Sequence, residues 1–301
     1  MERPRTRFKI DNMRQLFFCL LLLILFATAA MAQKVENLIV ITTDGLRWQE
    51  VFGGIDTALA NSKRYNQGDS AYLYQIYGGA TVQEKRKKLM PFLWNTLASH
   101  GQLYGNRTFG NKVNNANPHW FSYPGYSELF TGFVDKEINS NNFPPNPHTT
   151  VLEFIHAQPK YRGKVAAFTA WDAFDRILNE HRAGFPVVAA YDTVAGNNLS
   201  SRQKLVNEML LASYRPWHGN ECLDVFTHYA AMEYLKEKQP KVLYIGYGET
   251  DEWAHSGQYR FYLDAAHQVD KWINEIWNFV QSHPAYKNKT GLLITTVHGR
   301  G

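Results

Sequence analysis

Short apolar runs alternate along this chain with longer segments in which apolar residues recur at helical spacing. The runs are rich in β-branched residues, which is typical of strands buried on both faces of a sheet. They are Leu38–Thr43, Lys164–Thr169, Lys241–Tyr247 and Gly291–Thr296. Helical spacing is found in Met90–Ala98, Val151–Ile155, residues 200–238 with an interruption at Pro216, and Phe261–Val280. Gln102–Asn106 is expected to be a short strand, and Pro186–Tyr191 fits either a helix or a strand. This alternation predicts an α/β fold, a three-layer sandwich with a mostly parallel central sheet.

The first 32 residues have the pattern of a cleaved export signal. A basic segment precedes the apolar run Leu16–Ala27, and Ala30-Met31-Ala32 forms a small-x-small cleavage site. Met13 is an alternative start for this signal. The apolar run has about a dozen residues, whereas a membrane-spanning helix needs roughly 20. We therefore expect one domain, residues 33–301, that is periplasmic or secreted and has no membrane anchor after cleavage.

Charge and cysteine content narrow the class of partner. The formal net charge is +5, of which the expected signal contributes +3, so the remaining chain is near +2. A broad basic surface for nucleic acid is therefore not expected, and the basic cluster Lys85–Lys88 is interpreted as the solvated start of a helix. Beyond the signal only Cys222 remains, which excludes an intrachain disulfide and a cysteine-based zinc site.

Potential metal ligands follow three of the expected strands. Asp44 follows the run Leu38–Thr43, Asp251 and His255 follow Lys241–Tyr247, and His298 follows the last run. Side chains that leave the carboxyl ends of parallel strands converge on one crevice. Asp251 and His255 are four residues apart, so on a helical turn they face the same way. Taken alone, Asp44 before Gly45 is also a common turn or helix cap. Together these residues predict a metal site that the fold assembles.

Four segments occur in the order found in the alkaline phosphatase superfamily. They are Ile39–Gly45, Ser122–Gly132, Asp251–His255 and Val297–Gly299. The chain resembles the type I phosphodiesterase/nucleotide pyrophosphatase branch of that superfamily from Asn37 to Gly301, nearly the whole chain beyond the signal. The resemblance implies an alkaline phosphatase-like α/β domain. The chain ends directly after the last motif, where the superfamily has a further histidine, so we expect a domain that is truncated at its C-terminus.

The resemblance also implies a site with two divalent metal ions, usually zinc, around a serine or threonine nucleophile. In this chain Asp44, Ser122 and His298 would hold the first ion, and Asp251 and His255 the second. Ser122 would be the nucleophile at the start of a helix, where free backbone N–H groups favour an anionic substrate. Two alternatives to this role of Ser122 stay open. Ser127 could be the nucleophile instead, and Ser122 could serve only as a helix cap, for which serine is a common residue.

Several positions depart from the family pattern. Val297 stands where the family has an aspartate ligand, so each metal ion would have few protein ligands. Gly125 stands where the family has an asparagine that contacts the phosphoryl group, and Asn114, Asn115 or Asn117 would have to replace it; Asn115 and Gly125 are our candidates for substrate binding. Trp171 is a third candidate, at the wall of the substrate pocket.

The resemblance implies an exported, metal-dependent hydrolase of phosphate monoesters or diesters that forms a covalent phosphoseryl intermediate at Ser122. One alternative is an inactive superfamily member that acts as a binding protein, because Val297 and the missing histidine weaken the metal sites. A sulfatase is less favoured, since Tyr126 stands where the sulfatase pattern has arginine. A cofactor-independent phosphoglycerate mutase shares the core, but an exported chain would not meet its glycolytic substrate.

Overall fold

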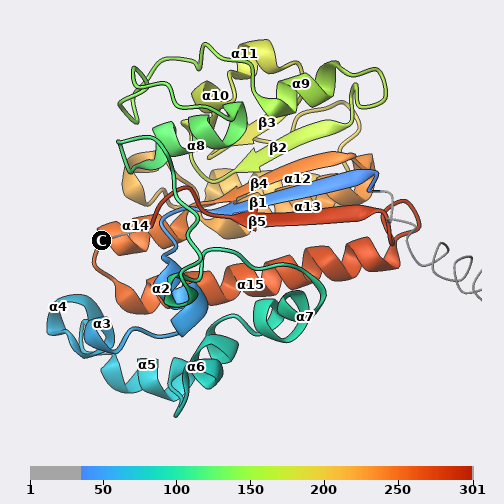
Figure 1. The fold of residues 1–301 in the computed structure, drawn as a ribbon. Coiled ribbons are helices and arrows are strands. Elements are labelled where there is room, and N and C mark those ends of the chain that lie inside the picture. The colour runs from blue at the N-terminus through green and yellow to red at the C-terminus, as the bar shows by residue number, and fades with distance from the viewer. Residues whose placement is uncertain (1–34, 300–301) are drawn as a thin grey trace, which may run out of the picture. The chain divides into compact units, whose positions relative to one another are not determined.

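Five parallel strands form the central sheet of residues 35–299, the part of the chain that the computed structural model describes (Figure 1). The expected export signal, residues 1–32, lies outside the described residues. The strands are β1 (Asn37–Thr43), β2 (Val165–Thr169), β3 (Val187–Ala189), β4 (Val242–Tyr247) and β5 (Thr290–Thr295). They pair in the order β3-β2-β4-β1-β5. The four strands predicted from apolar runs are confirmed, and the ambiguous segment Pro186–Tyr191 contains β3.

Helices pack on both faces of this sheet, as a three-layer α/β arrangement requires. Successive side chains of a strand point to opposite faces, so Ile39 and Ile41 contact one helical layer and Val40 contacts the other. The first layer contains α13 (Asp224–Lys238) and α15 (Tyr259–Ser282). The second contains α8 (Ser122–Thr131), α9 (Val151–Ala157), α10 (Phe174–Ile177) and α11 (Glu180–Ala183). In Figure 1 the last three of these helices are drawn above the strands.

A group of short helices near the start of the described chain packs on α15. These helices are α2 (Trp48–Gly53), α3 (Thr57–Asn61), α4 (Lys63–Asn66), α5 (Ser70–Tyr77) and α6 (Val82–Leu89). Their apolar residues form a separate cluster with Tyr259 and Tyr262 of α15. The basic cluster Lys85–Lys88 is helical, as predicted, and belongs to α6. It lies toward the end of that helix, however, and not at its start. Among residues 35–299 no helix, α15 included, combines the length and apolar content needed to cross a membrane.

Two segments differ from the prediction. Residues 102–106 do not form a strand: Gln102, Leu103 and Tyr104 are exposed, and Gly105 has a φ of 96° that extended backbone does not adopt. The helical stretch 200–238 is two helices, α12 (Ser201–Ala212) and α13, with a 3₁₀ turn (Trp217–Gly219) after Pro216. The other elements are a π-helical turn (Leu93–Leu97), α7 (Ala98–His100), a 3₁₀ turn (Arg107–Phe109) and α14 (Glu249–His255).

A buried carboxylate connects α15 to the segment before α7. Asp270 of α15 is 1% exposed. Its Oδ2 accepts a hydrogen bond from the backbone N–H of Phe92 (2.7 Å), and its Oδ1 accepts one from that of Leu93 (2.8 Å). Both N–H groups belong to the first turn of a helical segment, where backbone donors lack partners within the helix.

Replacing this carboxylate is expected to destabilise the fold. Asp270→Ala leaves two buried N–H groups without acceptors and should lower the free energy of unfolding by about 2 kcal/mol or more. Chemical denaturation followed by circular dichroism measures the change. The control is Lys271→Ala, which alters the exposed neighbouring residue and should stay within about 0.5 kcal/mol of wild type. Equal losses in both variants would contradict the assigned role of Asp270.

Candidate metal centre

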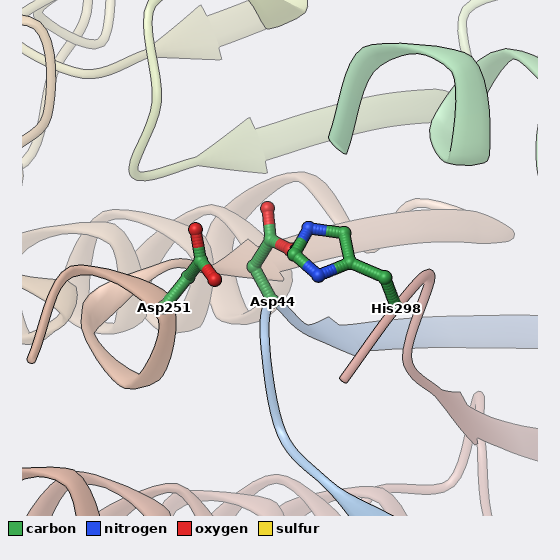
Figure 2. Close-up of side chains that lie close together, drawn as sticks. All are labelled: Asp44, Asp251 and His298. Carbon is green, nitrogen blue, oxygen red and sulfur yellow. The ribbon is translucent and has the colours of Figure 1, made fainter. Parts of the chain in front are cut away.

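Three of the expected metal ligands meet at the carboxyl edge of the sheet. Asp44 follows β1, Asp251 lies on α14 after β4, and His298 follows β5. Because β1 pairs in parallel with both β4 and β5, the three chain segments leave the sheet side by side. Figure 2 shows the side chains pointing toward one another. One ligand atom from each residue lies within 4.8 Å of the others, and all three residues are buried.

The backbone around Asp44 is fixed against the end of β4. The N–H of Asp44 donates to the carbonyl of Tyr247 (2.9 Å), and the hydroxyl of Thr250 donates to the carbonyl of Asp44. The next residue, Gly45, has a φ of 66°, and a Cβ there would lie 2.4 Å from Asp251 Oδ1 and 2.7 Å from Asp251 Cα. Glycine is therefore required at position 45 by both the backbone conformation and the close approach of Asp251.

His298 contacts the other groups of the site through one ring nitrogen. Its Nε2 lies 3.0 Å from Asp44 Oδ1 and 2.9 Å from the hydroxyl of Ser122. Its Nδ1 lies 3.2 Å from the carbonyl oxygen of Gly299, which is only an acceptor, so Nδ1 carries a proton. Burial lowers the pKa of His298, but Asp44, through its side-chain contact and charge, and Asp251 outweigh burial and raise the pKa to about 9.

This arrangement differs from a serine–histidine–aspartate triad. In a triad the serine contacts Nε2 and the carboxylate contacts Nδ1, so the ring passes a proton between them. Here Ser122 and Asp44 both face Nε2, and Nδ1 faces the backbone. A metal-binding histidine commonly donates its second N–H to a backbone carbonyl, which holds the other nitrogen ready as a ligand. The geometry therefore fits a shared cation better than a proton relay.

Ser122 is the first residue of α8 and is buried beside His298. Phe121 occupies the N-cap position, so Ser122 is not a helix cap. Two of the first helical residues offer no free backbone donor here, because Tyr123 N–H donates to Asn141 Oδ1 and Pro124 has no N–H. Ser127 instead accepts a hydrogen bond from Asn146 Nδ2 (3.1 Å). Of the two candidate nucleophiles, Ser122 is the one whose hydroxyl contacts the centre.

His255 is placed beside Asp251 but outside the group of three. Its Nε2 lies 3.1 Å from Asp251 Oδ2, and its side chain is 53% exposed. Both residues lie on α14, as their spacing predicts. The start of α14 is fixed by an exchange of hydrogen bonds: Asp224 accepts from the N–H groups of Gly248 and Glu249, and Glu249 accepts from that of Asp224.

The three candidates for substrate binding each contact another part of the protein. Asn115 Nδ2 donates to the carbonyl of Val297. Gly125 packs against the same residue, since a Cβ at Gly125 would lie 3.0 Å from Val297 Cβ. Val297 itself is 2% exposed and belongs to the apolar cluster under α8. Trp171 forms an isolated antiparallel bridge with Glu221 and packs edge-on against Phe174.

Sequence reasoning missed two residues at this edge of the sheet, Thr250 and Glu221. Thr250 lies next to a predicted ligand but has no pattern of its own. Glu221 follows no predicted strand, and only the folded chain brings it to the end of β2, so no sequence signal identifies it. Two other histidines lie outside the centre: His228 is buried and stacks on Trp272, and His267 Nδ1 contacts the carbonyl oxygen of Leu89 (2.7 Å).

The donor atoms suit a divalent cation. Two carboxylates and an imidazole are ligands that zinc accepts, and manganese also binds such sets. No protein-family model matches the chain, and comparison with curated proteins finds no match. The function is therefore inferred from the geometry of the site and from the motifs.

Gly45 provides a test of the geometry. Gly45→Ala should displace Asp251 and weaken binding of Zn²⁺ at least about tenfold, measured by calorimetry. The matched control is Gly132→Ala, because Gly132 also has a positive φ, 77°, but a Cβ there meets nothing within 4 Å. That control should lose only the strain energy of about 1–2 kcal/mol and keep its metal affinity. Unchanged affinity in Gly45→Ala would contradict the site.

The raised pKa of His298 predicts how stability depends on pH in the metal-free protein. The folded value, about 9, exceeds the ordinary value of 6.5. The ion pair with Asp44 therefore stabilises the fold fully below pH 6.5, and this contribution is lost as the pH rises through 9. In chelator, the free energy of unfolding of wild type should fall over this range, relative to His298→Gln, by up to roughly 3 kcal/mol. Parallel pH profiles for the two proteins would contradict the assignment.

Proposed function

We propose that this protein is a metal-dependent hydrolase of phosphate monoesters or diesters, with Ser122 as the nucleophile. The observation that supports it most is the position of the Ser122 hydroxyl, 2.9 Å from His298 Nε2, which itself lies 3.0 Å from Asp44. A buried hydroxyl beside a set of metal ligands is the arrangement that an activated serine needs. The four motifs shared with the alkaline phosphatase superfamily point to the same chemistry.

The reaction has two displacement steps at phosphorus. Ser122 Oγ forms a bond to the phosphorus of the ester while the bond to the leaving oxygen breaks. The serine proton passes to solvent, and the leaving group departs as an alkoxide or phenolate that takes up a proton from solvent. Water then attacks the phosphoseryl group, releases the phosphate product and restores the hydroxyl. Divalent cations would supply positive charge that favours loss of the serine proton and neutralises the phosphoryl oxygens. Asp44, Asp251 and His298 would hold that charge in place.

The number and identity of the cations follow from the resemblance to the superfamily. We infer two ions, zinc in both positions, with Asp44, Ser122 and His298 for the first and Asp251 and His255 for the second. The proximity of Asp44, Asp251 and His298 supports at least one ion. His298 loses its Nε2 proton when it binds a cation, so affinity should increase with pH below about 9. The signal pattern at residues 1–32 supports action outside the cytoplasm.

A second candidate function is metal-dependent or ligand binding without catalysis. It is favoured by Val297, which occupies the position of a family carboxylate and is buried among apolar residues. Valine offers no lone pair, so the cation nearest Ser122 would have fewer protein ligands than the roughly three of a catalytic zinc site. A protein of this kind would bind phosphate esters at this centre without turnover.

Substitution of the serine separates the two functions. Ser122→Ala should lower kcat for nitrophenyl phosphate or bis-nitrophenyl phosphate on the order of 10³-fold or more, because it removes the nucleophile. Metal analysis of the same variant should still find bound zinc. The control is Ser127→Ala on the same helix, which removes a buried hydroxyl remote from the centre and should keep at least a substantial part of the activity.

The contrary results are equally specific. Zinc-loaded wild type that binds these esters without releasing nitrophenol would favour the binding protein. Wild-type turnover in Ser122→Ala would exclude the phosphoseryl route. Loss of turnover in chelator, followed by recovery on adding zinc, is expected for the hydrolase.

A further inference from the structure

Glu221 lies at the same edge of the sheet as the metal ligands. Its backbone forms an antiparallel bridge with Trp171, two residues after β2 ends. Its side chain reaches the end of β4, because a Cβ built on Gly248 would lie only 1.8 Å from Glu221 Oε1. In the order β2-β4-β1-β5, Glu221 and His298 therefore lie on opposite sides of Asp44 and Asp251.

The carboxylate of Glu221 is buried, and one of its two oxygens accepts no hydrogen bond. The residue is 5% exposed, and Oε1 is a buried atom with no hydrogen-bond partner. A buried charge of this kind is costly unless another charge neutralises it. Its electrostatic neighbours are acids. Burial raises the pKa of Glu221 well above the ordinary value, and Glu252, Asp224, Asp44 and Asp251 raise it further.

Asp251 is connected to Glu221 through the backbone at Gly248. Gly248, against which Glu221 packs, accepts a hydrogen bond at its carbonyl from the N–H of Asp251 (2.9 Å). Among the described residues, Asp44, Asp251 and His298 form the group whose ligand atoms share one point, and Glu221 is not a member of it. A cation that Glu221 contacts would therefore occupy a different position from a cation beside Ser122.

We propose that Glu221 supplies negative charge to a second divalent cation, held between it and Asp251 on the β2 side of the centre. This inference rests on the two-ion part of the proposed function and adds a ligand that the motifs do not contain. It explains a buried carboxylate oxygen without a donor, since a cation or a water bound to that cation is its natural partner. It also explains glycine at position 248, because any side chain there would displace the carboxylate.

Removing the charge while keeping the shape tests this role. Glu221→Gln should weaken the second of two Zn²⁺ or Mn²⁺ binding steps, followed by calorimetry on the purified chain, by about tenfold or more. The first step should change little. In chelator the same variant should unfold at an equal or higher temperature than wild type, because a carboxylate surrounded by other acids has been removed. The control Glu252→Gln removes a neighbouring charge and should change affinity no more than a few-fold.

Gly248→Ala provides an independent variant in case Glu221→Gln fails to fold. Gly248 has a φ of −120°, which alanine adopts, so the new methyl group acts mainly by displacing Glu221. It should weaken the same binding step. Combined with Glu221→Gln, it should weaken metal binding no further than either change alone.

Three results would overturn the proposal. They are two metal ions bound with wild-type affinity in Glu221→Gln, unchanged affinity in Gly248→Ala, or no second ion in wild type at millimolar Zn²⁺ and Mn²⁺. Failure of the proposed function is distinguishable from these. In that case wild type would bind two ions, one of them dependent on Glu221, and yet hydrolyse no phosphate ester.

Discussion

Parallel pairing of β1 with β4 and β5 is the constraint on which the site depends. In an antiparallel sheet the ends of neighbouring strands alternate between opposite edges, and Asp44 would lie a strand length from Asp251. Here Thr43 is in register with Tyr247, and Thr42 with Thr295, so all three connections leave the sheet at the same level. The parallel direction of the strands thus brings the ligands together, and Gly45 and Thr250 adjust only their local geometry.

The strand ends were predictable from the sequence because two independent patterns agree there. Buried strands show as β-branched runs, and polar residues that directly follow such runs are exposed to the ligand crevice. This reasoning places Asp44, Asp251 and His298 together, and the fold confirms their proximity. It works because each ligand is within a few residues of a regular element.

The features that sequence reasoning missed depend on contacts between distant segments. Residues 102–106 have a strand-like composition but no partner strand, so they remain irregular. Asn115 and Gly125 both contact Val297, a pairing across more than 170 residues of chain that the sequence does not predict. Glu221 reaches the site through a bridge of one residue pair. No local sequence pattern predicts such contacts, because they form only when segments far apart in the sequence meet in the folded protein.

Acidic groups are concentrated at the carboxyl edge of the sheet. Burial raises the pKa of Asp224 and of Glu249, which exchange hydrogen bonds at the start of α14. Asp44 and Asp251 lie nearby. A protein pays for such a concentration in stability unless protons or cations compensate it. Positive charge brought by a ligand would therefore stabilise the fold as well as take part in chemistry.

The position of β5 indicates which part of the sheet a bound cation would stabilise most. None of its six residues is buried, whereas all six of β4 are, and within the described chain it pairs on one side only, with β1. His298 is thus attached to the least protected strand of the sheet, while the two carboxylates are attached to its interior. Local opening of β5 would remove the imidazole from the centre and leave both acids in place. An ion bound by Asp44, Asp251 and His298 would hold this outer strand against the sheet. Exchange of the β5 backbone amides with solvent should therefore be slower when the metal site is occupied.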